Sequence, residues 1–206
     1  MSSKAHWESI YDEKQPDDVS WHQAEPRLSL QLIEAVAINK EARILDVGGG
    51  ASRLASFLLA AGYKNISVLD ISQKTLQYAK AQLDSRGDEI EWIASDILSF
   101  SPKIKLELWH DRALFHFLTD PKDRQRYVDV LKRSLNADGY VMIASFAIDG
   151  PTQCSGLPIV QYDGAKLSNE LGAGFTLLKQ EIEIHRTPWG ADQKFIYCLF
   201  QRKVYL

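Results

Sequence analysis

Between residues 43 and 146, short apolar runs alternate with stretches whose apolar side chains follow helical spacing. Five runs are rich in β-branched and other apolar residues, at 43–47, 65–70, 90–94, 106–110 and 140–146. Helical spacing begins near Ser52, after a predicted N-cap at Ser72, and after Asp120-Pro121. Such alternation is typical of βαβ units wound around a mostly parallel sheet.

The two ends of the chain depart from this alternation. Two long strand-like runs, 175–186 and 193–203, are joined by a turn at 187–190 and predict an antiparallel hairpin at one sheet edge. We therefore expect an α/β fold: a single Rossmann-like seven-stranded, mostly parallel sheet with helices on both faces and a C-terminal antiparallel hairpin. Residues 1–40 are expected to form an N-terminal lid or extension, with a helix at about 27–37, and residues 41–206 the main α/β domain.

Composition excludes several classes of partner. The chain has 206 residues and a formal net charge of −3, and its Lys and Arg residues are scattered among acids. Nucleic-acid binding is therefore not expected. Cys154 and Cys198 fit no metal-ligand spacing, so we expect no metal site and free thiols in a reducing cytoplasm. No apolar stretch approaches the roughly 20 residues that a membrane-spanning helix needs, and we expect a cytoplasmic protein without membrane contact.

Polar residues and glycines follow the first three predicted strands. Asp46-x-Gly48-x-Gly50 ends the first, Asp70 ends the second and Asp96 follows the third. Open α/β sheets bind ligands at the carboxyl ends of their strands. Glycine lets the backbone turn sharply and approach a ligand, and the two later acids suit ribose hydroxyls and an exocyclic amine. The pattern predicts an adenosine pocket.

The first turn distinguishes between adenosine cofactors. A nicotinamide fingerprint that started at Gly48 would need glycine at position 53, where this chain has Arg53. The carboxylate of Asp46 also suits a cationic ligand better than a pyrophosphate. S-adenosyl-L-methionine carries a sulfonium and an amino group and no phosphate, so the charges favour it. An NAD-dependent oxidoreductase and a non-catalytic S-adenosylmethionine-binding regulatory protein are the alternatives.

Four segments resemble the motifs of class I S-adenosylmethionine-dependent methyltransferases. They are Ile44–Gly50, Val68–Ser72, Ala94–Ile97 and His110–Leu118. The resemblance implies that Gly48, Gly49 and Gly50 lie along the cofactor's methionine part, with Asp46 and Asp111 near it. It also implies that Asp70 holds the ribose and Asp96 the adenine amine, with Ile71 and Ile97 packed on the ring. Ser52 replaces the third glycine of the first motif.

The N-terminal segment resembles that of a bacterial branch of this family, with distant likeness to protein-lysine methyltransferases. The resemblance is carried by two short motifs, Trp-x-x-x-Tyr at 7–11 and Ser-Trp-His-Gln at 20–23, on a stretch with little helix period. We expect a lid in which Tyr11 and Trp21 face the cofactor and exclude water. A hydrophobic clamp on the sheet edge is the alternative reading.

Methyl transfer requires a positioned nucleophile, and a base only when that nucleophile arrives protonated. The candidate bases are Asp111, His110 and His22, with His116 more typical of a core histidine. None is assigned as catalytic. The fourth predicted strand is not followed by the Asn/Asp-Pro-Pro-Tyr motif used for planar nitrogens, which leaves a small molecule or a protein lysine as acceptor. Monomer and homodimer both remain open.

Overall fold

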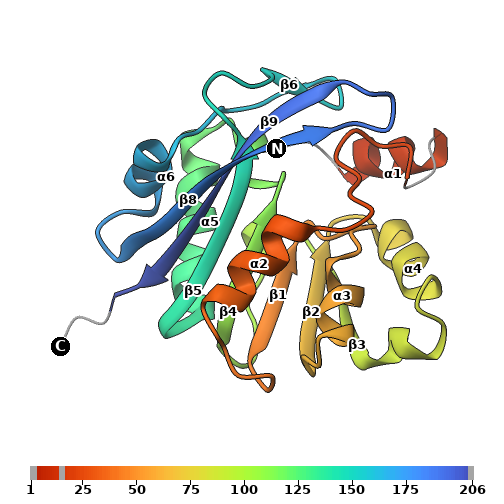
Figure 1. The fold of residues 1–206 in the computed structure, drawn as a ribbon, viewed down its shortest axis with the longest axis horizontal. Coiled ribbons are helices and arrows are strands. Elements are labelled where there is room, and N and C mark those ends of the chain that lie inside the picture. Colours follow the sequence, from red (N-terminus) through yellow and green to blue (C-terminus); the bar gives the residue numbers. More distant parts are fainter. Residues whose placement is uncertain (1–3, 14–16, 204–206) are drawn as a thin grey trace.

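The computed structural model describes residues 4–13 and 17–203. Within these ranges, seven strands form one sheet in the order β3-β2-β1-β4-β5-β9-β8 (Figure 1). Neighbours among β1 to β5 pair in parallel, whereas β9 runs antiparallel to both β5 and β8. The predicted Rossmann-like sheet and its reversed hairpin are therefore confirmed. The strands are β1 Arg43–Val47, β2 Asn65–Asp70, β3 Ile90–Ala94, β4 Leu106–Arg112, β5 Leu135–Phe146, β8 Phe175–Arg186 and β9 Asp192–Arg202.

Helices cover both faces of the sheet, as the βαβ pattern predicts. One face packs against α2 (Arg27–Ala35), α3 (Leu54–Ala60) and α4 (Gln73–Ala81), whose buried side chains share one apolar cluster. The other face packs against α5 (Pro121–Ser134) and α6 (Gly164–Leu171). In Figure 1, α2 crosses in front of the sheet and α5 lies behind it. Short 3-10 turns follow α4, β3 and β4: η1 Asp84–Glu89, η2 Ile97–Ser99 and η3 Phe115–Phe117.

Side-chain caps fix where several helices begin. The Ser72 hydroxyl accepts a hydrogen bond from the Thr75 backbone N–H and starts α4. The Asp120 carboxylate accepts one from the Lys122 N–H, and Pro121 occupies the first turn of α5. Such caps satisfy donors that have no partner inside the helix. The two predicted start sites are confirmed.

Three local predictions are wrong. Residues Lys4–Glu13 form a helix, α1, although they show little helix period. Tertiary contacts supply what the local pattern lacks: the Trp7 ring packs edge-on against Trp21 and Phe117. Strand β5 begins at Leu135, five residues before the predicted run at 140–146, and passes through Asp138 and Gly139, where the sequence favours a turn. The segment 151–158, which is rich in Gly and Pro and where no strand was expected, contains a small hairpin, β6 (Gln153–Cys154) and β7 (Leu157–Pro158).

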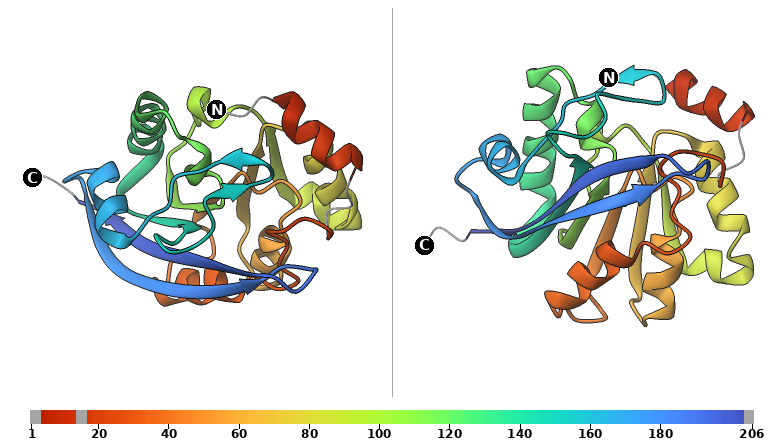
Figure 2. Two further views of the ribbon diagram at one scale, coloured as in Figure 1. Left: turned by 90° about the horizontal axis from the view of Figure 1, so that it is seen from above. Right: turned by 45° about the horizontal axis from the view of Figure 1, so that its top comes forward.

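These additions gather at one end of the sheet. Seen from above, α1 and the β6–β7 hairpin lie across the carboxyl ends of the central strands (Figure 2). Helix α2, in contrast, packs on the sheet face through Leu32 and Ile33. The region before β1 thus has two parts, of which α1 lies over the predicted ligand edge.

Candidate active site

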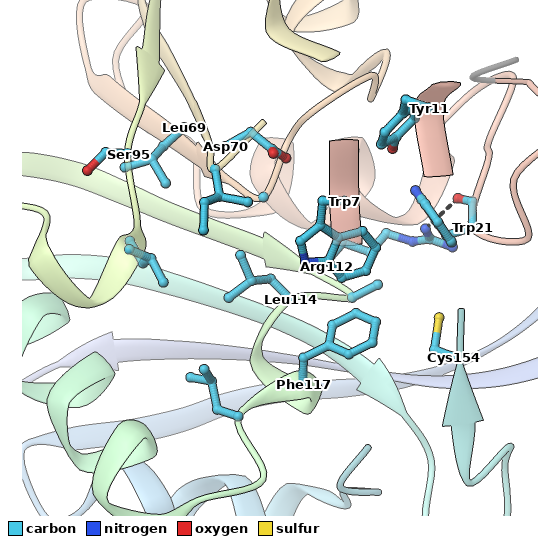
Figure 3. Close-up of a pocket in the computed structure, with 15 residues that line it drawn as sticks. Trp7, Tyr11, Trp21, Leu69, Asp70, Ser95, Arg112, Leu114, Phe117 and Cys154 are labelled. Carbon is cyan, nitrogen blue, oxygen red and sulfur yellow. Dashed lines mark hydrogen bonds between the residues drawn. The ribbon is translucent and has the colours of Figure 1, made fainter. Parts of the chain in front are cut away.

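A cavity opens at the carboxyl ends of β1, β2 and β4, beneath α1. Its apolar part is enclosed by side chains from the strand ends, from η3, from α1 and from β6, drawn in Figure 3. A polar part continues past Gly48 toward Asp46, His110 and Arg53. The two parts share Tyr11, Trp21, Gly48 and Arg112.

The glycine turn after β1 is packed too closely for any side chain. Gly48 has φ of +66°, and a Cβ added to it would lie 2.7 Å from Leu114 Cδ1. Its N–H donates to the Leu69 carbonyl at 2.7 Å, which ties the turn to the end of β2. A Cβ on Gly49 would lie 2.7 Å from Asp46 Oδ2. Glycine is therefore required for both conformation and space.

Asp70 lies at the end of β2 and lines the apolar part of the cavity. Its Oδ1 accepts a hydrogen bond from the Ser72 N–H at 2.8 Å. Burial, which disfavours the charged carboxylate, raises the pKa of Asp70 to about 6, and the nearby Asp46 acts in the same direction. The site thus contains a carboxylate that titrates close to neutral pH.

The structure separates the residues after β3. Ile97 and the preceding Ser95 line the cavity, as does Ile71 after β2. The Asp96 carboxylate instead accepts a hydrogen bond from the Leu98 N–H at 2.9 Å and caps η2. Asp96 is half-buried beside the cavity rather than among the residues that line it.

A buried hydrogen-bonded chain lies under the polar part. His110 Nδ1 is 2.7 Å from Asp46 Oδ1, and His110 Nε2 is 2.9 Å from the Ser29 hydroxyl. The second carboxylate oxygen, Asp46 Oδ2, is buried and has no hydrogen-bond partner in the described part of the chain. Asp46 and His110 both line this part of the cavity, so the unpaired acceptor atom lies in its wall. His22 lines the same part from the N-terminal segment.

Asp111 does not face the cavity. Its prediction as a cofactor contact or as a candidate base is therefore wrong. Asp111 is fully buried, and its carboxylate accepts hydrogen bonds from the Tyr127 hydroxyl at 2.6 Å and from the Leu114 and Phe115 N–H groups. Successive side chains of a strand point to opposite faces, so His110 and Arg112 point toward α2 and the N-terminal segment while Asp111 points toward α5. Burial raises the pKa of Asp111 to about 6.

Sequence reasoning missed Phe117 and Cys154 as cavity residues, and it named Trp7 only within the N-terminal motif and Arg112 only, with Asp111, as part of a methionine-binding wall. Arg112 had a usable signal, because it lies two residues after His110 and shares its side of β4. The other three reach the cavity through α1, η3 and β6, whose packing no local pattern predicts. In Figure 3, the Arg112 side chain lies beside Trp7 and Trp21, with Phe117 and Cys154 on the opposite wall.

Arg112 forms an ion pair with Glu183, whose carboxylate lies 3.6 Å from Nη2, and burial keeps three other titratable groups nearby neutral. Burial raises the pKa of Tyr11 well above its usual value and raises the pKa of Cys154 to about 11. Burial, and then the charge of Arg112, lower the pKa of His116 to about 3. Around its one guanidinium, this side of the cavity therefore offers apolar and neutral surface.

A parallel sheet with a glycine turn after its first strand and an acid after its second defines the class: a Rossmann-like domain with an adenosine-type site. Residues 44–139 match the family described as Methyltransferase domain. Human EEF1A lysine methyltransferase 2 is 21% identical over 195 residues, which cover 87% of this chain and 77% of that protein.

Two solved structures illustrate the similarity of fold. A protein studied for the conversion of a disulfide bond into a thioacetal group during echinomycin biosynthesis has a TM-score of 0.80 and 19% identity, over 98% of this chain and 93% of that one. The N-methyltransferase NodS from Bradyrhizobium japonicum WM9, in complex with S-adenosyl-L-homocysteine, has a TM-score of 0.74 and 20% identity, over 96% and 98%.

Domain match, motif residues and fold agree: residues 44–139 belong to a methyltransferase domain of the class I S-adenosylmethionine-dependent type. Its cofactor is S-adenosylmethionine, and its reaction is methyl transfer from that cofactor. No helix among residues 4–13 and 17–203 is long and apolar enough to cross a membrane.

Proposed function

We propose that the cofactor's adenosine occupies the apolar part of the cavity and its methionine the polar part. Ile71 and Ile97 would pack on the adenine and Asp70 would accept hydrogen bonds from the ribose. Three features support this fit. Gly48 lines both parts of the cavity, Asp46 Oδ2 is a buried acceptor without a partner in the described chain, and apolar walls flank Asp70.

Asp46, Gly48, Gly49 and Gly50 would then lie along the methionine part, where Asp46 Oδ2 suits an ammonium group. Tyr11 and Trp21 line both parts of the cavity and would border the cofactor from the N-terminal segment. Asp96 would act indirectly, since its carboxylate caps η2 and so positions Ile97.

For the acceptor, we propose a small, largely apolar molecule rather than a protein side chain. The observation that carries this is the position of Trp7. Its ring lies 5.0 Å from the Phe117 ring and 6.0 Å from the Trp21 ring, centroid to centroid, which places α1 over the cavity. A cavity covered by a helix and lined by aromatic rings suits a small planar ligand that it can surround. A protein substrate would instead need an open groove for the backbone on either side of the methylated residue.

S-adenosylmethionine supplies a methyl group already activated by its sulfonium. The protein's contribution is to hold the acceptor in line and to exclude water, and orientation of this kind is worth roughly 7–11 kcal/mol. We propose that residues 4–13 and 17–23 act as the lid and that α2 belongs with residues 41–206, because α2 packs into the sheet cluster. Cys154 and Cys198 are both free and buried, which supports a cytoplasmic location.

Two measurements test the proposal. Calorimetry with S-adenosyl-L-homocysteine should show binding that Asp70→Ala abolishes and that Asp88→Ala, at an exposed acid paired with Lys80, leaves unchanged. Purified protein is then incubated with methyl-labelled S-adenosylmethionine and cell extract, which is separated into low-mass and protein fractions. Label in the low-mass fraction supports the small-molecule acceptor. Label in protein lysines overturns it and favours the activity named for the human relative.

A further inference from the structure

Arg112 is the buried cation of the cavity wall. Its side chain is only 9% exposed although it carries a permanent charge. Nε donates to the Tyr197 hydroxyl at 2.7 Å, and Nη1 donates to the Trp21 carbonyl at 2.8 Å. The Phe195 ring lies 4.5 Å from the guanidinium carbon. These contacts fix the guanidinium where the two parts of the cavity meet.

The third nitrogen of the guanidinium, Nη2, differs from the other two in its hydrogen bonding. It is buried and has no hydrogen-bond partner among the residues that the structure describes. The nearest carboxylate oxygen, Glu183 Oε2, is 3.6 Å away. That carboxylate already accepts hydrogen bonds from the Tyr197 hydroxyl and from Gln23 Nε2. A buried donor on a charged group is costly to leave unsatisfied, so Nη2 is a site for an acceptor atom brought by a ligand.

The residues around Arg112 determine which sign of charge a bound ligand can carry. Trp7, Phe117 and the neutral Cys154 thiol form the apolar wall near Arg112. The Glu183 carboxylate, 3.6 Å from Nη2, offsets part of the guanidinium charge. Its oxygens already accept hydrogen bonds from Tyr197 and Gln23, so the unpaired Nη2 still favours an anionic oxygen over an ammonium in this weakly polar environment. Burial makes two groups near Arg112 poor proton acceptors: it keeps the Tyr11 hydroxyl protonated and lowers the pKa of the His116 imidazole to about 3.

We propose that Arg112 Nη2 binds an ionised oxygen of the methyl acceptor, so that the substrate is a planar anion such as an aromatic carboxylate. The inference rests on the proposed small-molecule function and restricts the methyl acceptor to anions. A lysine ammonium is the kind of acceptor that this wall disfavours. One other anion could reach Arg112, namely the carboxylate of the cofactor's own methionine part, and the experiment separates the two.

The probes are matched acids and amides: benzoate with benzamide, and 2-naphthoate with 2-naphthamide. Their binding to the protein saturated with S-adenosyl-L-homocysteine is followed by the fluorescence of Trp7 and Trp21, which line the cavity, and checked by calorimetry. We expect at least one acid to bind about tenfold or more tightly than its amide. Equal affinity within both pairs, or no binding by either acid, overturns the proposal.

Variants assign the preference to Arg112. With the variant saturated by S-adenosyl-L-homocysteine, Arg112→Gln should abolish the acid preference. Arg124→Gln is the matched control, because Arg124 is also largely buried (14% exposed) but pairs with Glu170 beside α5 and α6. A large loss of S-adenosyl-L-homocysteine affinity in Arg112→Gln would assign the guanidinium to the cofactor instead and overturn the proposal.

Two further readings keep the test decisive. If Arg112→Gln does not fold, Arg112→Lys retains a cation without the planar fork and should keep a reduced acid preference. Failure of the wild-type protein to bind S-adenosyl-L-homocysteine at all would count against the proposed function, whereas cofactor binding without any acid preference counts against the anion site alone.

Discussion

His110 Nδ1 lies 2.7 Å from Asp46 Oδ1, joining the fourth strand of the sheet to the first directly beneath the polar part of the cavity. The other ring nitrogen of His110 is 2.9 Å from the Ser29 hydroxyl on α2. The side chains of His110 and Asp46 are each about 3% exposed. His110, predicted as a candidate base, is thus held between two partners, and its geometry fits a residue that orients Asp46.

Replacement of His110 tests this role. His110→Leu leaves the buried Asp46 carboxylate without its partner, so we expect unfolding free energy to fall by about 3 kcal/mol. The affinity for S-adenosyl-L-homocysteine should fall about tenfold, since Asp46 is no longer oriented. His110→Asn can still donate to Asp46 and should recover part of both losses. Urea titration and calorimetry measure the two effects, and unchanged cofactor affinity in His110→Leu would remove the positioning role.

Gly48 is predicted to tolerate no side chain. Gly48→Ala adds a Cβ 2.7 Å from Leu114 Cδ1 at a φ of +66°. Gly62→Ala is its matched control, because Gly62 also has positive φ, +89°, but open space around it. The control should lose about 1 kcal/mol from backbone strain. Gly48→Ala should lose more and should bind S-adenosyl-L-homocysteine at least tenfold more weakly; equal behaviour would show that the contact is not limiting.

Cofactor affinity is predicted to depend on pH through Asp70. The pKa of Asp70 is raised to about 6 by burial, so the carboxylate gains a proton as pH falls from 7 to 5. A protonated carboxyl is a poorer acceptor for ribose hydroxyls, and the affinity for S-adenosyl-L-homocysteine should decrease over this range. Asp70→Asn should bind weakly with a flat profile between pH 5 and 7. A wild-type profile without a step near pH 6 would contradict the assignment.

The ligand-free protein should show the opposite trend. An Asp with a pKa raised in the folded state binds more protons when folded than when unfolded between about pH 4 and 6. Unfolding free energy therefore rises as pH falls through about 6 and levels off near the unfolded pKa of about 4. Asp111 contributes in the same direction, since its pKa is also raised to about 6. Urea titrations at pH 5 and 7 should show a smaller difference in Asp70→Asn than in wild type.

The sequence predicted well where the strands end and which residues meet at that edge of the sheet. Asp46, Gly48 and Asp70 follow apolar runs whose length and β-branched content predict strands, and a parallel sheet brings those ends to one edge. The same reasoning predicted the helix start at Ser72, because capping is a local interaction. The sequence pattern was thus sufficient for features that depend on neighbouring residues, such as strand ends and helix caps.

Side-chain partners across the sheet could not be predicted. Whether Asp111 faces the cavity depends on the pleat of β4, and its carboxylate is satisfied by Tyr127 from the following helix. Helix α1 has little apolar period, and it forms through ring contacts of Trp7 with residues 14 and 110 positions away, Trp21 and Phe117. Contacts of this range leave no signature in the local sequence.

The Asp111–Tyr127 pair is predicted to support the fold rather than the reaction. The Tyr127 hydroxyl donates to Asp111 and accepts from Trp109 Nε1 at 2.7 Å. Tyr127→Phe removes both bonds in a fully buried site, so we expect a loss of about 2 kcal/mol of unfolding free energy. Tyr140→Phe, at a partly buried hydroxyl whose contact with Gln201 is 3.5 Å, should lose far less. Reduced cofactor affinity in folded Tyr127→Phe would argue against a purely structural role.

Trp7 distinguishes a lid from a clamp. If α1 closes over the cavity, Trp7→Ala should release it without unfolding the sheet, because local segments can open at lower free energy than the whole domain. We expect faster protease cleavage within residues 4–23, a nearly unchanged melting temperature and a lower kcat/KM for the acceptor. Trp189→Ala is the control, since Trp189 is 60% exposed in the turn between β8 and β9. A clamp predicts the reverse for Trp7→Ala: a marked fall in melting temperature with cleavage spread over the chain, because the segment would then contribute to global stability.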